Sequence, residues 1–533
     1  MSDDHTTGRS GGRGRVVMLV DNSVHGDSRV QKSARSAADA GWEVILVGRS
    51  PDKETHDWRL GEAKVHLIPV PKPLARRRHE FRRAPLRSPL AYPPGPLASY
   101  RKQRVKAWRA DLNERNIALQ VGAAAGMSRL SLLIGRIRLI IPRLAARVLA
   151  PWVALRVRHT YALKRTRTEL DSPLDRFTTR FWQSTMGDRS WRKLDPHLWD
   201  WELAYSKVID DLRPDLIHAN DFRMLGVGAR ARMRALVRGR SIKLVWDAHE
   251  FLPGIKPWND NPRWHPAQCA HEREYSSHAD AVVTVSETLA DMLIERHQLT
   301  ERPTVVLNTP GGVPDAGDTT GSAPDLRELC GIGADVPLVV YSGAAAPQRG
   351  LGIMVEALPQ LDGVHVALVV LKPTSDYVRG LLDRAEELGV GDRVHALPYV
   401  AHDQVVPFLS AADVGVIPIH HWPNHEIALI TKFFEYSHAR LPLVVSDVKT
   451  MAEVTRKTGQ GEVFIAEDVD DYVRALRSVL SDPKQYRAVY DVPGLLEQWN
   501  WEAQADILDQ VYTRLLLDRQ RPGTALPTQE AKE

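Results

Sequence analysis

Short apolar runs alternate with helical patterns over two long stretches of the chain. In the first stretch, the runs that predict strands are residues 16–20, 43–47, 65–70, 215–218, 243–247, 281–285 and 304–307. In the second stretch, they are residues 336–341, 365–371, 393–396, 414–419, 443–446 and 463–465. Strands that alternate with helices are typical of parallel sheets. The pattern therefore predicts an α/β protein with two Rossmann-like, doubly wound domains that face each other across a cleft.

Breaks in this pattern set the expected domain boundaries. Polar tails and a Pro- and Gly-rich connection are typical of segments outside a packed core. The predicted segments are a disordered tail (1–15), an N-terminal domain (16–308) with a helical insert (about 71–195), a linker (309–335), a C-terminal domain (336–498), a C-terminal crossover helix (499–517) and a second disordered tail (518–533).

Basic residues are unevenly distributed along the chain. The net charge of the whole chain is only +5. Residues 71–170, however, hold 23 Lys and Arg against 4 Asp and Glu, which is a net charge of +19. A basic block inside an otherwise acidic protein indicates a local anionic partner.

The insert combines these basic residues with apolar ones. A helical stretch is expected over residues 118–167, broken at Pro142 and Pro151. At about 100° per residue, four arginines fall on one helical face. These are Arg129, Arg136, Arg143 and Arg147. Apolar side chains cluster beside them, although Arg138 and Arg156 interrupt the separation. The pattern favours a helix that lies in an anionic membrane surface.

Two other interpretations of the insert stay open. One is a helical hairpin packed on the first domain, with its arginines in solvent. The other is a nucleic-acid-binding protein, which only the basic block supports. Because no nucleic-acid-binding motif is recognisable, nucleic acid is not an expected partner.

Cysteine content and the N-terminus bear on the compartment. The two cysteines, Cys269 and Cys330, match no metal or redox spacing, which favours a reducing, cytoplasmic environment. The segment Met1–Arg15 has no apolar core of the kind found in signal peptides. No run of eighteen uncharged apolar residues predicts a spanning helix. We therefore expect a cytoplasmic protein that associates peripherally with the inner face of the membrane.

Two segments of the second half carry candidate phosphate-binding residues. The turn after residues 336–341 contains Gly343 and the cation Arg349, and small residues there let a backbone approach phosphate. Further on, Asn424 and Glu426 precede Lys432 and Glu435, which are three residues apart and share a helical face. A cation there can meet phosphate while the carboxylate accepts ribose hydroxyls. A tight turn with a surface arginine and a surface salt bridge are the structural alternatives.

The first half places histidine and acidic residues directly after two predicted strands. These are the segments 217–221 and 246–250, which include Asp221 and His249. Ligands of open parallel sheets bind at the carboxyl ends of the strands. A single histidine at this edge is more often structural, but two such clusters favour a site.

The order of these motifs resembles that of family 4 glycosyltransferases of the GT-B fold. The stretches that carry the resemblance are residues 27–30, 40–44, 218–221, 247–250, 279–286, 305–308, 397–400, 411–418 and 432–436. They cover both halves but not residues 71 to about 195. The resemblance implies a retaining, hexosyltransferase-type glycosyltransferase with a nucleotide diphosphate sugar as donor and no metal or other cofactor.

The resemblance also implies roles for individual residues. Glu435 would bind the ribose, Lys432 and Arg349 would face the diphosphate, and His249 would lie near the transferred sugar. Lys432, Arg349 and His249 would be the catalytic residues. Gly343, Glu426 and Asn424 complete the implied donor site, and Gly26, Arg29 and Asp221 form the acceptor side.

The sequence departs from the family pattern at three positions. The family has a carboxylate at position 427, where this chain has Ile427, and Glu426 is one residue away. Ala344 replaces a cation that usually follows the glycine of the first turn, and Arg349 replaces a lysine. These departures leave the donor sugar open.

Together, these features predict sugar transfer from a nucleotide diphosphate donor to a lipid-linked or polysaccharide-precursor acceptor. The alternatives are a GT-B sugar epimerase and a catalytically weak nucleotide-sugar-binding scaffold of an envelope-synthesis assembly. The missing carboxylate at position 427 is the strongest argument for the scaffold.

Overall fold

The computed structural model divides into two compact units. It describes residues 13–72, 74, 89–93, 96–169, 173–255, 262–311, 323–401 and 404–517. One unit comprises residues 1–71, 201–255 and 271–533, and the other comprises residues 72–200 and 256–270. The expected tails and the Arg- and Pro-rich residues 76–83 fall largely outside the described residues.

The first sheet of the larger unit has eight strands in the order β3-β4-β2-β1-β5-β6-β7-β8. The strands are β1 (Arg15–Leu19), β2 (Glu43–Arg49), β3 (His56–Leu60), β4 (Ala63–Ile68), β5 (Leu216–Asn220), β6 (Lys243–Ala248), β7 (Ala281–Thr284) and β8 (Thr304–Val305). All pairs are parallel except β3 with β4. The edge strand β3 escaped prediction because its sequence alternates polar and apolar residues instead of forming an apolar run.

Helices α1 (Ser28–Asp39), α8 (Leu198–Leu212), α9 (Asp221–Val237), α10 (Trp264–Ser276) and α11 (Glu287–His297) connect these strands. Two of them begin at side chains that cap their free amides. Asp27 accepts from the backbone N–H of Val30, and Ser286 accepts from that of Leu289.

The second sheet has six parallel strands in the order β11-β10-β9-β12-β13-β14. They are β9 (Leu338–Ser342), β10 (His365–Val369), β11 (Val394–Leu397), β12 (Val414–Ile417), β13 (Leu443–Ser446) and β14 (Gly461–Phe464). The chain order reverses between β9 and β12, so the sheet opens into a crevice at the carboxyl ends of these two strands. The prediction of two parallel α/β domains is confirmed.

The helices of this domain are α12 (Leu326–Cys330), α13 (Gly352–Glu356), α14 (Asp376–Glu387), α15 (Val405–Leu409), α16 (Pro423–Glu426), α17 (Thr431–His438), α18 (Lys449–Thr458), α19 (Val469–Ser481) and α20 (Pro483–Arg487). Helix α12 lies inside the segment expected to be a linker. Leu326 is fully buried in the core cluster that contains Leu338 and Val340. The packed domain therefore begins before residue 336.

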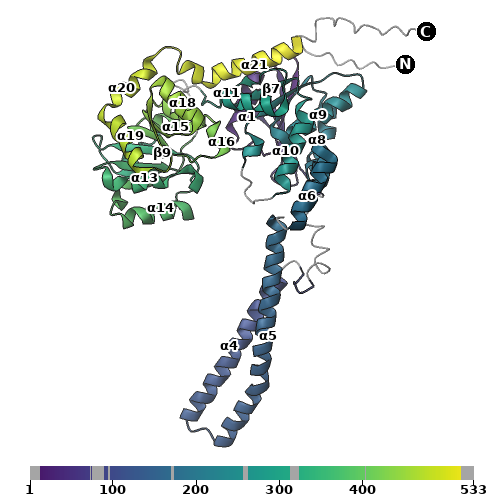
Figure 1. Ribbon diagram of the computed structural model, residues 1–533, viewed down its shortest axis with the longest axis vertical. Helices are drawn as coiled ribbons and strands as arrows, with labels where there is room; N and C mark the ends of the chain where they lie inside the picture. Colours follow the sequence, from purple (N-terminus) through teal and green to yellow (C-terminus); the bar gives the residue numbers. More distant parts are fainter. Residues whose placement is uncertain are drawn as a thin grey trace, which may run out of the picture. The chain divides into compact units, whose positions relative to one another are not determined.

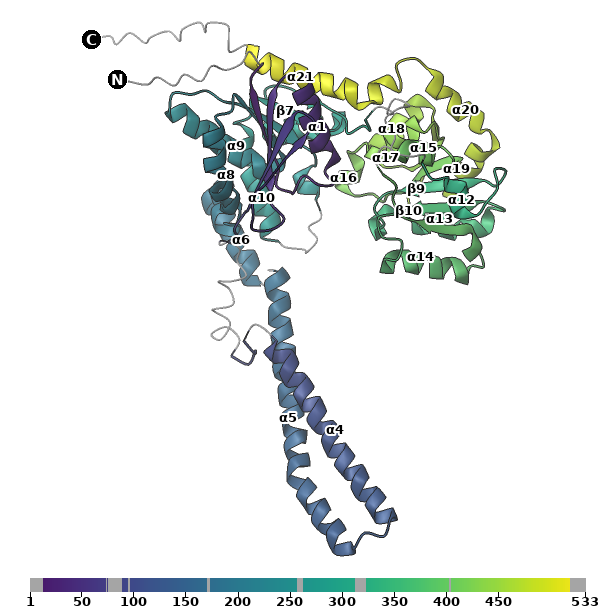
Figure 2. The ribbon, with the colours of Figure 1, turned by 180° about the vertical axis from the view of Figure 1, so that it is seen from behind.

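The last helix, α21 (Trp501–Leu517), returns to the first domain, as Figures 1 and 2 show. Its apolar face joins the core beside β1 and α1. Trp501 donates its indole N–H to Ser36 Oγ at 2.8 Å, and the Tyr512 hydroxyl lies 2.7 Å from His218 Nδ1. The helix is thereby part of the first domain, although it follows the second domain in sequence.

The smaller unit contains α4 (Leu97–Ala124), α5 (Arg129–Glu169), α6 (Pro173–Met186) and α7 (Trp191–Leu194). Helices α4 and α5 form a hairpin and lie side by side in both ribbon views (Figures 1 and 2). The expected helix breaks at Pro142 and Pro151 are wrong, because α5 runs through both prolines. Packing of Leu139 and Ala146 against α4 offsets the missing backbone hydrogen bonds. None of the described helices is long and apolar enough to cross a membrane.

Candidate active site

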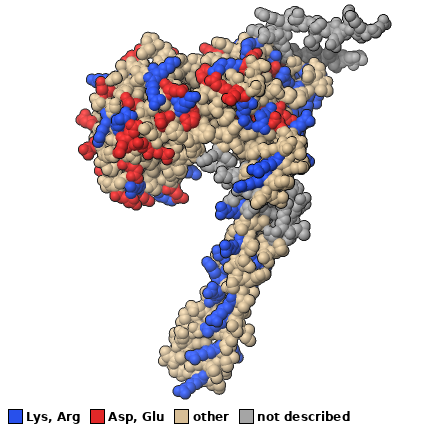
Figure 3. Space-filling view, in the orientation of Figure 1, with Lys and Arg blue, Asp and Glu red and all other residues tan. Residues whose placement is uncertain are grey.

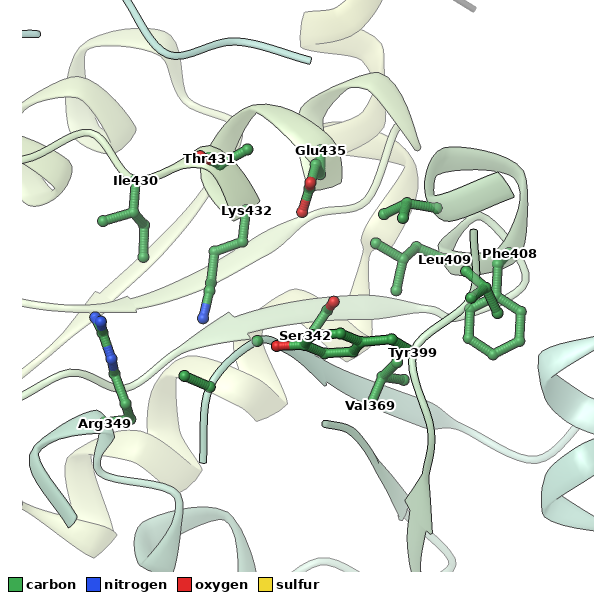
Figure 4. Close-up of a pocket in the computed structure, with 14 residues that line it drawn as sticks. Ser342, Arg349, Val369, Tyr399, Phe408, Leu409, Ile430, Thr431, Lys432 and Glu435 are labelled. Carbon is green, nitrogen blue, oxygen red and sulfur yellow. The ribbon is translucent and has the colours of Figure 1, made fainter. Parts of the chain in front are cut away.

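A cavity of about 430 Å³ opens at the carboxyl ends of β9 and β10, beside the first turn of α17 (Figure 4). It is lined by Ser342, Gly343, Ala344, Arg349, Val369, Tyr399, Val400, Val405, Phe408, Leu409, Ile430, Thr431, Lys432 and Glu435. Of the six predicted donor-site residues, Gly343, Arg349, Lys432 and Glu435 are among them. The structure therefore brings these four residues together at one edge of the sheet.

The turn after β9 is shaped by close contacts that require glycine. Gly343 has φ of 143°, and a Cβ there would overlap the ammonium of Lys432. The Tyr341 hydroxyl donates to the carbonyl of Ala344 at 2.8 Å, which fixes the outer part of the turn. The missing side chain therefore lets the turn backbone and Lys432 face the same space.

Arg349 and Lys432 are free cations. Within the described residues, neither side chain has a hydrogen-bond or ion-pair partner, although the Lys432 ammonium lies 4.0 Å from the centre of the Tyr341 ring. In Figure 4, both nitrogen-bearing ends lie in the cavity, and Lys432 and Glu435 extend from α17. Burial and the charge of Arg349 lower the pKa of Lys432 to about 7, against the opposing effect of Glu435. An anion between these cations would restore the charged lysine.

Glu435 lines the same cavity, one helical turn after Lys432. Burial raises the pKa of its carboxyl group, although Lys432 and Lys32 oppose this effect. Tyr399, Phe408 and Leu409 supply apolar and aromatic surface to the same cavity. The cavity therefore combines cations, one carboxylate and a wall suited to a flat ring.

A second cavity, of about 500 Å³, lies against the first domain. It shares Ile430 and Thr431 with the first cavity and is also lined by Asn22, His25, Gly26, Asp27, Ser28, Arg29, His249, Glu250, Val285, Asn308, Ala428 and Leu429. Asn308 donates from Nδ2 to Thr431 Oγ1 at 3.2 Å. The predicted residues Gly26, Arg29 and His249 therefore share one cavity next to the first.

His249 belongs to a buried ionic network around Asp247. Its Nε2 lies 3.3 Å from Asp247 Oδ2, and its Nδ1 lies 3.6 Å from Asp221 Oδ2. Burial lowers the pKa of His249, but these two carboxylates outweigh burial and raise it to about 9. His249 is therefore an imidazolium at neutral pH.

Arg29 is a partner in this network. Its Nε and Nη2 donate to both oxygens of Asp247, at 3.1 and 2.9 Å, and its Nη1 donates to the carbonyl of Val306. Only 5% of its side chain is exposed. Although Arg29 borders the second cavity, its guanidinium is committed to Asp247.

Two predicted donor-site residues point elsewhere. The Glu426 carboxylate accepts from the backbone N–H of Lys449 at 2.8 Å and lies 2.6 Å from His421 Nδ1. Asn424 Oδ1 accepts from the backbone N–H of Phe251 at 3.0 Å. Neither residue lines either cavity, and Ile427 is only 3% exposed. The structure therefore does not bring Glu426 or Asn424 together with Lys432.

Several lining residues were not singled out from the sequence. Tyr399 follows β11, Asn308 follows β8, and Thr431 precedes Lys432. Position after a parallel strand is the signal that could have marked the first two. No sequence periodicity marks Phe408 and Leu409, because α15 is only one turn long.

Comparison with known families decides the class. The Glycosyltransferase Family 4 model matches residues 157–310, and the Glycosyl transferases group 1 model matches residues 324–491. The chain is a family 4 glycosyltransferase. A D-inositol 3-phosphate glycosyltransferase of Mycolicibacterium smegmatis is 25% identical over 310 residues, which are 57% of this chain and 68% of the relative.

Solved structures show that this glycosyltransferase has the GT-B fold. Sucrose-phosphate synthase from Thermosynechococcus elongatus matches with a TM-score of 0.56 and 16% identity over 95% of this chain and 100% of the other. The Anabaena protein HepE in complex with UDP-glucose matches with a TM-score of 0.52 and 14% identity over 94% of this chain and 100% of the other.

Proposed function

We propose that this glycosyltransferase moves a sugar, with retention of configuration, from a nucleotide diphosphate donor to a lipid-linked or polysaccharide-precursor acceptor at the cytoplasmic membrane face. The observation that carries the proposal is the cavity at the carboxyl ends of β9 and β10, which holds two free cations and Glu435. A nucleoside diphosphate needs this combination of charges.

Arg349 and Lys432 would neutralise the leaving diphosphate, without a metal ion. Charge on the β-phosphate grows as the glycosidic bond breaks, so cations already in place stabilise the transition state more than the ground state. The first amides of α17 add a partial positive charge at the same place. Glu435 would accept hydrogen bonds from the ribose hydroxyls, and the aromatic wall would hold the base.

The second cavity would receive the sugar and the acceptor. His249 lies in it as an imidazolium. Its Nδ1 is 3.6 Å from Asp221, too far for a hydrogen bond, so this N–H would donate to a sugar or acceptor oxygen. Gly26 leaves space at the entrance, since nothing lies within 4 Å of the place where its Cβ would be. The position of this cavity next to the cations supports transfer between the two domains.

The basic insert supports the membrane part of the proposal. Its arginines would attract anionic lipid, and this would concentrate the enzyme where a lipid-linked acceptor is located. The relatives support the donor class, because HepE was crystallised with UDP-glucose.

The test is transfer of labelled sugar from a panel of nucleotide donors, with and without lipid-linked acceptors. A true donor first shows itself as an increase in the melting temperature, because it binds the folded state. We expect labelled lipid only with the matching donor and acceptor, and we expect NMR to show the anomeric configuration of the donor in the product. Release of free sugar alone, or an inverted product, would contradict the proposal.

Glu435→Gln should weaken binding of the free nucleoside diphosphate by roughly tenfold, because a charged acceptor of the ribose hydroxyls becomes neutral. Isothermal titration calorimetry measures the effect. Glu426→Gln is the matched control, and it should leave this affinity within about twofold, since Glu426 lies outside both cavities. A loss of affinity only in the Glu426 variant would reverse the two assignments.

One observation favours a second function, that of a catalytically weak nucleotide-sugar-binding scaffold. Ile427 is buried at the family's carboxylate position, and Glu426 is held by His421 and Lys449. Such a scaffold would bind the donor in the thermal-shift assay and transfer no sugar with any acceptor.

A further inference from the structure

The hairpin of α4 and α5 exposes an unusually large apolar surface. Twelve large apolar side chains of α5 are more than a third exposed. Leu149 and Tyr161 lie on other sides of the helix. The remaining ten are Leu130, Leu133, Ile134, Ile137, Ile140, Ile141, Leu144, Val148, Trp152 and Leu155. Among them, Ile141 is 77% exposed and Val148 is 70% exposed. Contiguous apolar surfaces of this kind mark a site of interaction.

These ten side chains lie on one face of the helix. At about 100° per residue, they fall within an arc of about 120°, and the only other residue of that arc between Leu130 and Leu155 is Pro151. We call this face the α5 stripe. Over 25 residue steps of about 1.5 Å, the stripe is about 38 Å long.

The opposite face of α5 is the one that packs. Leu139 and Ala146 are buried against α4 in a cluster with Leu112, and a Cβ on Gly135 would collide with Leu119. Leu139 and Ala146 lie about 180° from the centre of the stripe. Helix α5 thus has an inner face that holds the hairpin together and an outer face that no described residue of this unit covers.

Arginines border the stripe on both edges. Arg129, Arg136 and Arg147 are exposed along one edge, and the exposed Arg138 lies on the other. Residues 125–158 contain no Asp or Glu. Figure 3 shows basic side chains along the hairpin with uncharged ones between them. Arg138 therefore does not interrupt the amphipathic pattern, as the sequence suggested, but completes its second edge.

We propose that the α5 stripe is a membrane-docking surface, along which α5 lies parallel to a bilayer that contains anionic lipid. The stripe would enter the level of the outer acyl chains, while arginines on both sides bind lipid phosphates and Trp152 rests among the headgroups. Helix α4 would then face away from the lipid. This surface rests on the proposed function at a membrane and defines the partner and the mode of contact.

Charge complementarity favours a bilayer over a second copy of the chain. Two stripes packed together would bring arginine edges against arginine edges, with no acidic residue in this segment to pair them. Anionic headgroups would pair the same arginines while the acyl chains cover the stripe. The geometry also explains why a helix that cannot span the membrane is so apolar on one side.

The test compares two variants of the full chain that add the same two negative charges. Ile141→Glu with Val148→Glu alters the stripe, whereas Gln103→Glu with Gln120→Glu alters exposed positions of α4. Sedimentation with vesicles of phosphatidylglycerol and phosphatidylcholine gives the partition coefficient. We expect at least a tenfold decrease for the stripe variant and a change of less than about twofold for the α4 variant. Circular dichroism verifies that both remain helical.

Brominated acyl chains provide an independent readout. They should quench fluorescence of the wild-type protein more than that of Trp152→Phe, because Trp152 would lie near the lipid. Equal sedimentation of the stripe variant and the wild type, or quenching that does not depend on Trp152, would overturn the proposal. A dimer in solution that the stripe variant dissociates, without vesicle binding, would assign the stripe to a second copy instead. Nucleoside diphosphate binding without vesicles reports on the proposed function separately.

Discussion

Lys432→Ala is expected to lower the turnover of the donor by tenfold at least and by up to roughly 100-fold, because the leaving diphosphate loses a cation that is already in place. The Lys432 ammonium lies against the Gly343 turn, where little space is left for a water molecule to replace it. No described side chain forms a hydrogen bond or an ion pair with this ammonium. Arg349→Ala should have an effect of similar size, since the two cations face the same cavity. Initial rates at saturating donor measure both.

Lys484→Ala is the matched control, because this exposed lysine of α20 lies outside the cavity. Wild-type rates in both cavity variants would contradict the assignment.

The pH dependence of donor binding adds a signature that packing alone cannot produce. The pKa of Lys432 in the free enzyme is about 7, so its charge is lost as the pH rises above 7. Diphosphate favours the charged form. Affinity should therefore fall above pH 7, with proton uptake on binding that calorimetry in two buffers detects and that Lys432→Ala abolishes.

Asp247→Asn is expected to destabilise the first domain by about 3–5 kcal/mol, because it leaves the buried guanidinium of Arg29 without its counter-charge. Arg29 is 4% exposed and Asp247 is 1% exposed, so water cannot replace the lost partner. Urea unfolding measured by tryptophan fluorescence reports the change, since Trp246 is buried next to Asp247.

The double variant Arg29→Met with Asp247→Leu should regain part of this stability, because it removes both buried charges.

The pH profile of stability gives a second measure of the network. The raised pKa of His249 means that its ionic contribution is complete below pH 6.5 and is lost as the pH rises through about 9. Without Asp247, this decline should be smaller. A single variant as stable as the wild type would show that the network around Asp247 carries little energy.

The sequence by itself determined the two parallel sheets and the edges at which the candidate site residues lie. Apolar runs of strand length and the helical patterns between them are local properties of the sequence, so they can be recognised before the packing is known. Lys432 and Glu435 could be assigned to one helix face because three-residue spacing fixes their direction on α17. The same rule of strand ends predicted that Arg349 and His249 lie at the carboxyl edges of their sheets, and each of them lines a cavity in the structure.

Only the tertiary structure decided what these residues contact. Arg29 meets Asp247 across 218 positions of sequence, and this pairing converts an expected acceptor-side cation into a buried structural one. Glu426 is one residue from the family's carboxylate position, but the loop turns it toward His421 and Lys449. On α5, the periodicity gave the angles of the arginines, but burial against α4 identified the inner face and therefore the outer one. The angular position of a side chain on a helix follows from the local spacing of residues. Its contacts and its exposure depend on segments that only the folded chain brings together.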